Sequence, residues 1–364
     1  MKAHKVPVTY LAGWKAQGFK SSFYVFYKHN LEKRGIRKNY KKFKKITLEH
    51  SYFIEEDFYY LSIKKTPGLL YKLKDEVEEF LTLYKYDIKC KKNVKESRKQ
   101  NLVSINNYDD FMRYKIHMDH WIISDTSGNT VDNYTFECTL ENELNKKIEK
   151  IIEKNYFADY LEPKWNVIKS EIEKIRMDKS VFEIEHKQDF LEFFVIQYLR
   201  VDNIIENEIS SSVMMFKEIF KLAGYEDDEL EKYSKKDGLL DVHTYFYTML
   251  LDAAKGNKSR IERFMKAIEE GYVCDLLHSQ DGIGYITSTS PCIDVIKYGE
   301  FKAEMLFPVS SKYCLKFTAK ALVQGRSGQY FEQTKDDVKI INRQIANSSK
   351  NIVISEVKYI MDRI

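Results

Sequence analysis

The sequence predicts an α+β fold, in which N- and C-terminal strands build one mixed sheet and a central helical bundle packs on it. Aromatic and β-branched runs gather near both ends of the chain, whereas the middle repeats its apolar residues with the period of a helix. With 364 residues, of which 43% are hydrophobic, the chain is long enough to bury a large core. We therefore divide it into a β-rich basic region over 1–140, a helical bundle over 141–278, and a β-rich region over 279–364 that completes the same sheet.

The N-terminal region is expected to form mainly strands. Strands are predicted at 21–28, "SSFYVFYK", and within 44–63, a mixed run that is followed by the turn Thr66-Pro67-Gly68. A helix is predicted over 69–84, because its apolar residues recur on one face. A strand, a Ser/Gly/Asn turn and a second strand make 119–140 a predicted hairpin.

The central region is expected to be helical throughout. An apolar stripe runs through 141–175, and Pro163 suits the first turn of a new helix within it. The most apolar segment, 187–205, is predicted to be the central buried helix. Three further segments are expected to complete the bundle, namely 210–225, 241–256 and 258–279.

Strand patterns return after Ser279. They cover the runs "GYITSTSP", "CIDVIKYG", "EMLFPVSS" and "YCLKFTAKALV". A short helix, "KDDVKIINRQIANSS", and a last strand, "KNIVISEVKYI", follow them. Because strands lie at both ends of the chain, the helices between them are expected to be a long excursion packed on a shared sheet.

The charge of the chain is balanced overall but uneven along its length. A net charge of +4, from 59 basic and 55 acidic residues, excludes a general nucleic-acid coat protein. The segment 28–45 nevertheless holds nine Lys or Arg and one acid, interleaved with Tyr40 and Phe43. Cations for phosphates and aromatic rings for stacking are what single-stranded nucleic acid needs, and an exposed Lys-rich hairpin is the alternative. The candidate nucleic-acid-binding residues are Arg34, Arg37, Lys38, Lys41, Lys42, Lys44 and Lys45.

The five cysteines are scattered, without the Cys-x-x-Cys spacing of a zinc ribbon or the even number of a disulfide framework. The first residues lack the apolar core of a signal peptide, and no segment approaches the ~20 apolar residues of a membrane span. We therefore expect a cytoplasmic protein without a membrane partner.

Four motifs in the same order carry a resemblance to a known family. The chain opens with "HKVPVTYLAGW" and continues with "LEPKW" and "VIQYLR", and the fourth motif is a C-terminal series of "YITSTSPCI", "MLFPVSSKYCLKF" and "INRQIANSSKNIVIS". This series resembles the bacterial family catalogued as domain of unknown function 4238, over most of the chain. The resemblance implies a shared fold, but no settled activity. Relatives often have Asp where this chain has Thr289, so any role of that acid is absent here or filled elsewhere.

The candidate catalytic residues are His4, Arg200, Ser288 and Asn342. His4 is suited to proton transfer or metal binding, and the alternative is a histidine that pins the first strand. Arg200 ends an apolar helix, where it would clamp a phosphate or form a structural salt bridge with Glu162 or Asp202.

The serine-rich strand end lacks the signatures of known catalytic classes. Neither a Gly-x-Ser-x-Gly motif nor a Walker loop is present, so a polar strand end that binds something is the interpretation that remains for Ser288. The cofactor is unknown, and a divalent metal stays open. His117, Asp119 and His120 have the density of metal ligands, but a strand would turn His120 away, so we favour a solvated strand edge there.

Two hypotheses about function follow. The first is an intracellular bacterial effector that acts on nucleic acid or a nucleotide, in the manner of a phage-defence nuclease, with His4 as the proton-transfer group and Arg200 as the phosphate clamp. The second is a non-catalytic binding or sensor module that docks a protein or nucleic-acid partner. A homo-oligomer stays open under both hypotheses.

Overall fold

The chain was analysed as a computed structural model, and its described residues divide into two compact units. Described are residues 2–4, 7–15, 22–27, 44–47, 54–56, 59–66, 68–92, 101–175, 181–199, 224, 242–280, 282–298, 301–349 and 352–357. One unit spans Tyr59–Ile151, and the other combines Lys2–Phe58 with Ile152–Ile364. The three regions proposed from the sequence are a separate description and stay a prediction.

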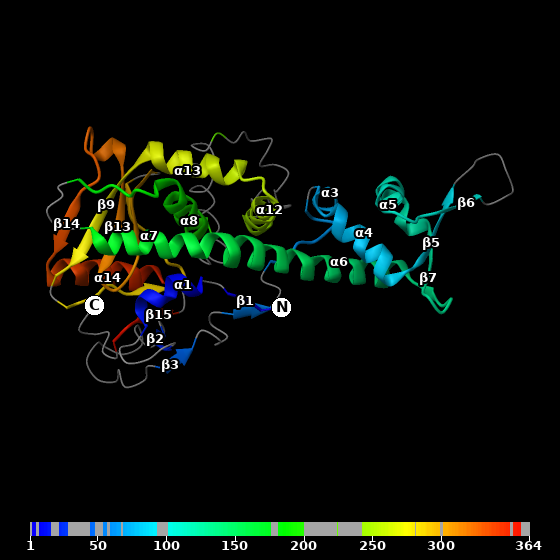
Figure 1. Ribbon diagram of the computed structural model, residues 1–364, viewed down its shortest axis with the longest axis horizontal. Coiled ribbons are helices and arrows are strands. Elements are labelled where there is room, and N and C mark those ends of the chain that lie inside the picture. Colours follow the sequence, from blue (N-terminus) through cyan, green and yellow to red (C-terminus); the bar gives the residue numbers. More distant parts are fainter. Residues whose placement is uncertain are drawn as a thin grey trace. The chain divides into compact units, whose positions relative to one another are not determined.

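The Tyr59–Ile151 unit combines helices with a four-stranded antiparallel sheet of order β6-β5-β7-β8 (Figure 1). The helical segment predicted over 69–84 is confirmed, although Leu73 leaves helical geometry and divides it. Phe80 and Phe136 pack with ring centroids 5.8 Å apart and join α4 to α6. The elements are α3 (Leu69–Lys72), α4 (Lys74–Tyr84), β5 (Asp87–Lys92), β6 (Asn101–Ser104), α5 (Tyr108–Tyr114), η2 (Lys115–His120), β7 (Trp121–Ser124), β8 (Thr130–Val131) and α6 (Asn133–Lys150).

One prediction in this unit is confirmed in part, and another was wrong. β7 and β8 form the antiparallel hairpin predicted within 119–140, but its second strand ends at Val131, because Asp132 accepts a hydrogen bond from the Thr135 backbone N–H at 2.9 Å and thereby starts α6. The segment with His117 and His120 is the 3-10 helix η2 and not a strand edge. The cap at Asp132 and the 3-10 turns at 115–120 therefore determine the local structure, although the sequence alternates there in the manner of a strand.

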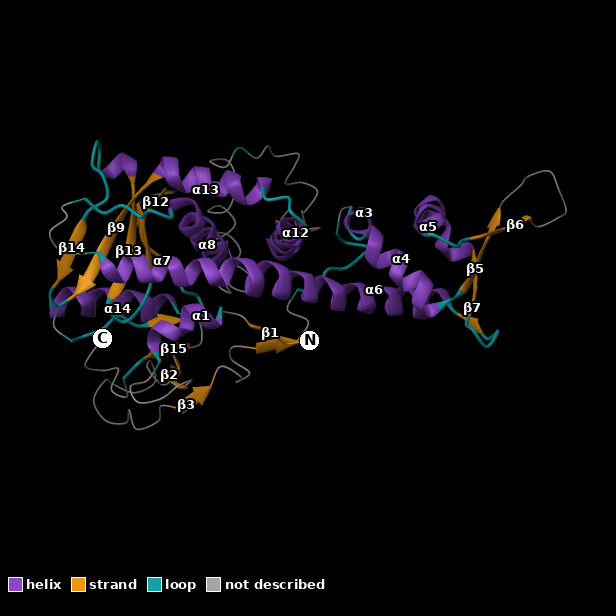
Figure 2. Cartoon of the chain, viewed as in Figure 1, coloured by secondary structure: helices purple, strands orange, loops and turns teal. Residues whose placement is uncertain are grey.

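The larger unit has two principal sheets and one small one (Figure 2). A four-stranded sheet of order β10-β15-β2-β3 joins strands from the two ends of the sequence, which confirms the predicted α+β fold. A five-stranded sheet of order β11-β12-β13-β9-β14 is antiparallel except where β14 runs parallel to β9. The strands are β1 (Lys2–His4), β2 (Ser22–Tyr27), β3 (Lys44–Thr47), β4 (Ile54–Glu56), β9 (Tyr272–Ser279), β10 (Thr287–Ser288), β11 (Ile293–Tyr298), β12 (Phe301–Pro308), β13 (Tyr313–Ala319), β14 (Tyr330–Gln333) and β15 (Ile352–Ser355).

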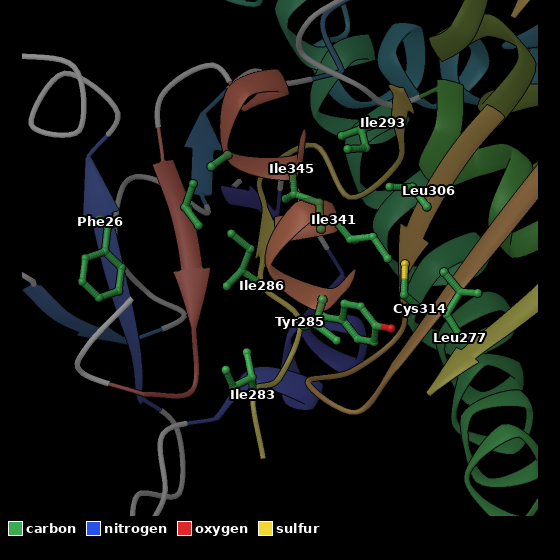
Figure 3. Close-up of a cluster of buried hydrophobic side chains, with 13 residues drawn as sticks. Phe26, Leu277, Ile283, Tyr285, Ile286, Ile293, Leu306, Cys314, Ile341 and Ile345 are labelled. Atoms are coloured by element: carbon green, nitrogen blue, oxygen red, sulfur yellow. The ribbon is translucent and has the colours of Figure 1, made fainter. Parts of the chain in front are cut away.

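The five-stranded sheet is covered on both faces. Phe317 of β13 stacks on Phe194 of α8 (Lys187–Leu199) with centroids 4.1 Å apart. Alternate side chains point the opposite way, so Cys314 and Leu306 face α14 (Lys335–Ser348). Figure 3 shows α14 between this sheet and Phe26 of β2. Burial on both faces explains why these strands read as nearly continuous apolar runs.

Among the described residues, the helices predicted for this unit are present, apart from the end of the segment expected over 258–279. Residues 272–279 were expected to end the helical bundle, but they form β9, the partner of both β13 and β14. Helical pattern and buried strand look alike over a short apolar run, and here the pairing with distant strands decides. The remaining helices are α1 (Val8–Leu11), η1 (Ala12–Trp14), η3 (Ile151–Leu161), α7 (Glu162–Lys174), α12 (Val242–Ala254), α13 (Ser259–Gly271) and η4 (Lys320–Leu322).

One helical run changes its geometry midway. Ile151–Leu161 is a π-helix between α6 and α7, and Pro163 lies in the first turn of α7 as predicted. The helix expected over 210–225 lies outside the described residues, except for Gly224. Among the described helices, none has the length and apolar character needed to cross a bilayer.

Candidate functional site

Distant segments of the chain meet around Tyr10. Its hydroxyl donates to the backbone oxygen of Pro308 at 2.6 Å and lies 2.8 Å from the Thr287 hydroxyl oxygen. The neighbouring Trp14 indole N–H donates to the Tyr285 backbone oxygen at 3.2 Å. Complete burial raises the pKa of Tyr10 well above its usual value, against the hydrogen bond from Thr287, so the phenol stays a neutral donor.

The short helix that carries Tyr10 must lie close to the end of β12. A Cβ atom on Gly13 would stand 3.0 Å from the Val309 backbone oxygen, so a larger residue would push the two segments apart. Tyr10 also stacks on Phe307 at 5.4 Å and approaches Trp165 at 6.0 Å. The opening motif is therefore a packing device that ties α1 to β12 and α7.

Ser288 closes a turn after β10. Its hydroxyl donates to the Ser290 backbone oxygen at 2.8 Å and accepts the Ser290 backbone N–H at 3.0 Å. β10 itself pairs with β15, with Ser288 opposite Val353. Since Ser288 is only 1% exposed, this hydroxyl is engaged in local structure.

Asn342 joins α14 to the chain that leads into β10. Its Oδ1 accepts the Ile286 backbone N–H at 3.0 Å, and its Nδ2 donates to the Gly284 backbone oxygen at 3.1 Å. The side chain is fully buried. The segment before β10 is irregular, and its Ile286 N–H and Gly284 oxygen need hydrogen-bond partners in the interior. The Asn342 amide supplies both of them.

The other predicted site residues are less fully described. His4 lies in β1, opposite Ile54 of β4, and its side chain is outside the description, as is the whole of Arg200. The structure brings Asn342 to the segment that ends in Ser288. The sequence also led us to expect that His4, Arg200, Ser288 and Asn342 meet where the terminal strands adjoin the central helix, and this stays a prediction. Of the candidate nucleic-acid-binding residues, Lys44 and Lys45 lie in β3, while Arg34, Arg37, Lys38, Lys41 and Lys42 lie outside the described residues.

A charged network around Glu192 was missed by the sequence analysis. This carboxylate of α8 is 4% exposed and accepts hydrogen bonds from Tyr156 at 2.9 Å and Tyr160 at 2.6 Å. The Lys258 ammonium lies 3.2 Å from it and 3.4 Å from the centre of the Tyr160 ring. Burial, together with the nearby Glu192 charge, raises the pKa of Tyr156 well above its usual value. The sequence does contain an indication of this network, because Glu192 is an acid within the most apolar helix and a buried carboxylate needs partners.

Gln197 lies one turn further along α8. It is 1% exposed, and neither amide atom has a hydrogen-bond partner among the residues described. Phe193 and Phe194, at helical spacings from it, contact Phe307. An unpaired buried amide lowers the stability of the fold by roughly 1–3 kcal/mol. Gln197 thus places a polar group within an otherwise apolar layer at this end of α8.

The segments described above are those that carry the family resemblance. The opening motif, the chain around Ser288, the end of β12 and α14 all meet in one core. A family model with the description "Protein of unknown function (DUF4238)" matches residues 2–358. This chain belongs to the DUF4238 family. No curated protein and no solved structure matches the chain.

One group of side chains in this DUF4238 protein has the spacing of metal ligands among the described residues: Glu171, Glu185 and His186. Glu171, however, accepts the backbone N–H groups of Glu185 and His186, the latter at 3.3 Å, and lies 3.0 Å from His186 Nδ1. These bonds hold the residues that lead into α8. The group is explained by the start of a helix, and we assign no metal to it.

The same contact predicts a pH-dependent stability. The hydrogen bond to Glu171 raises the pKa of His186 above its ordinary value of 6.5. The folded protein thus favours the protonated ring, so the stabilisation is complete below about pH 6.5 and is lost as the pH rises through the raised pKa. We expect the melting-temperature difference between wild type and His186→Gln to shrink from about pH 6 to about pH 9. A difference that is constant or grows with pH would contradict this assignment.

Proposed function

We propose that this DUF4238 protein binds nucleic acid through the basic segment 28–45. The supporting observation is that this segment begins directly after β2, which ends at Tyr27, and that its last two residues lie in β3, the antiparallel partner of β2. β3 is the outer strand of the four-stranded sheet and itself contributes Lys44 and Lys45. The Lys and Arg residues of the segment are therefore connected in sequence to two neighbouring strands of this sheet.

The chemistry of the segment suits a single strand. Each cation that neutralises a phosphate releases a counterion, so affinity falls with salt in proportion to the number of contacts. Tyr40 and Phe43 stand among the cations and offer faces on which bases stack. The competing explanation for these lysines is that charges on an edge strand prevent it from pairing with the sheets of other molecules. The experiment must distinguish this role from nucleic-acid binding.

The test compares two fourfold variants with equal loss of charge. One replaces Lys41, Lys42, Lys44 and Lys45 by Ala, and the control replaces Lys266, Lys312, Lys335 and Lys339, which lie outside the basic segment, by Ala. Binding of a labelled single-stranded RNA and a DNA of the same sequence is measured from about 50 to 300 mM salt. We expect the first variant to flatten the slope of log affinity against log salt by up to about 3, and the control to leave it unchanged. Equal slopes in both variants would remove the proposal.

We further propose that this binding serves a non-catalytic binding or sensor module. Ser288 and Asn342, which a nuclease-like site was expected to use, are buried and bonded to backbone groups. The competing proposal, a phage-defence nuclease, then depends on His4 and Arg200. We assign a cytoplasmic location to the module, in keeping with five free cysteines.

A cleavage assay separates the two proposals. Wild type, His4→Ala and Arg200→Ala are incubated with end-labelled RNA and DNA, with and without Mg²⁺ or Mn²⁺, and their melting temperatures are recorded. The module proposal expects no cleavage by any of the three proteins. Cleavage by wild type that is lost in His4→Ala at an unchanged melting temperature would establish the nuclease instead.

A further inference from the structure

A cavity of about 440 Å³ lies beside the five-stranded sheet, at the N-terminal end of α8. α8 and α13 form one side, β9 and β13 the floor, and the loop before β14 the other side. This volume falls within the range of small-molecule sites. The lining includes Phe190, Ile268, Val273 and Phe317 on the inside, and Glu183 and Lys320 toward the rim.

The inner part of this cavity is apolar. Phe190 and Phe317 stand parallel, with ring centroids 6.1 Å apart. Ile268 and Val273 complete the surface, and each of these four side chains is at most 5% exposed. A ligand that reaches this floor must therefore bring an apolar body, because a polar one would lose its hydration without compensation.

Cations stand at the rim. Lys187 is paired with Glu269 at 2.5 Å, and Arg326 with the buried Asp275 at 2.7 Å. Lys320 donates to the Glu269 backbone oxygen at 3.0 Å and has no carboxylate partner among the described residues. Lys320 is thus the rim cation that keeps spare N–H donors, while the Glu183 carboxylate, also at the lining, balances the overall charge.

The wall that carries Arg326 is rigid. A Cβ atom on Gly328 would stand 2.2 Å from the Cys274 backbone oxygen, so only glycine lets this loop lie against β9. Asp275 Oδ1 also accepts the Gln329 backbone N–H at 3.0 Å, and the Phe182 N–H bonds to the Gly328 oxygen at 2.9 Å. The cavity is therefore formed without a ligand, which lowers the entropic cost of binding.

We propose that this cavity binds a small amphiphilic anion, with its apolar body on the Phe190–Phe317 floor and its anionic head at Lys320. The spare N–H donors of Lys320 select the head group, and the apolar floor selects the body. This site is independent of the nucleic-acid proposal, because it lies on other elements and uses none of residues 28–45.

The probe is 8-anilinonaphthalene-1-sulfonate, which has an aromatic body and a fixed negative charge. We expect saturable binding to one site, measured by fluorescence and by calorimetry. Lys320→Ala should weaken it roughly tenfold, the worth of one charge-assisted hydrogen bond, and Lys335→Ala, on the exposed side of α14, should not change it. The uncharged analogue N-phenyl-1-naphthylamine should bind wild type and Lys320→Ala equally.

A second variant fills the cavity from the loop before β14 and leaves the buried core residues unchanged. Ser327 lines the cavity from an exposed position, so Ser327→Phe fills the space at an unchanged melting temperature and should abolish probe binding. Displacement by octanoate or by octyl phosphate then distinguishes a carboxylate head from a phosphate head. Absence of saturable binding, or binding that neither Lys320→Ala nor Ser327→Phe weakens, overturns the proposal.

Discussion

Replacing Glu192 by Ala is expected to lower the free energy of unfolding by about 3–5 kcal/mol. This carboxylate is the shared acceptor of two tyrosine hydroxyls and lies 3.2 Å from the Lys258 ammonium. Its removal leaves the Tyr156 hydroxyl without a partner in the protein interior and leaves Lys258, which is 26% exposed, without its counterion. Chemical denaturation followed by circular dichroism measures the loss.

The matched control for Glu192 is Glu173→Ala. Glu173 lies on α7, is 48% exposed, and pairs with Lys169 at 3.9 Å in the manner of a surface contact. Its removal should cost less than about 0.5 kcal/mol. Equal losses in the two variants would show that the Glu192 network does not stabilise the fold.

Replacing Asn342 by Ala is expected to cost about 2–4 kcal/mol. The change leaves the Ile286 N–H and the Gly284 oxygen without the partners they have at 3.0 and 3.1 Å, and each unsatisfied buried group costs roughly 1–3 kcal/mol. The exposed neighbour Arg343 supplies the control, since Arg343→Ala keeps the helix and touches neither group. A melting temperature for Asn342→Ala equal to that of Arg343→Ala would return this amide to the list of candidate functional groups.

The sequence predicts those strands and helices whose local residue pattern agrees with their packing in the folded protein. β2, β15 and α14 appear where alternation or helical periodicity places them. β9 was misassigned because its apolar run after α13 has no local mark of a strand, and its identity comes from β13, a distant partner. The π-helix has no sequence pattern of its own that separates it from an α-helix.

The candidate site shows the same division. Sequence patterns located the polar residues at Ser288 and Asn342, but not what their side chains bond to, because both bond to backbone atoms that any residue supplies. The Glu192 network could have been found, since an acid in an apolar helix requires partners. The partners themselves, Tyr156 and Lys258, come from other helices, and only the tertiary structure identifies them.

The pairing of β2 with β15 also sets an order of events during synthesis. Tyr10 and Pro308 are 298 positions apart, and β15 lies later still, so the first strands leave the ribosome long before their partners exist. The Tyr59–Ile151 unit, by contrast, closes its sheet with residues that are near one another in the sequence. The early strands must therefore wait, with unpaired edges, while the inserted unit folds first. We therefore expect β2 to stay open to chaperones until β15 has been made.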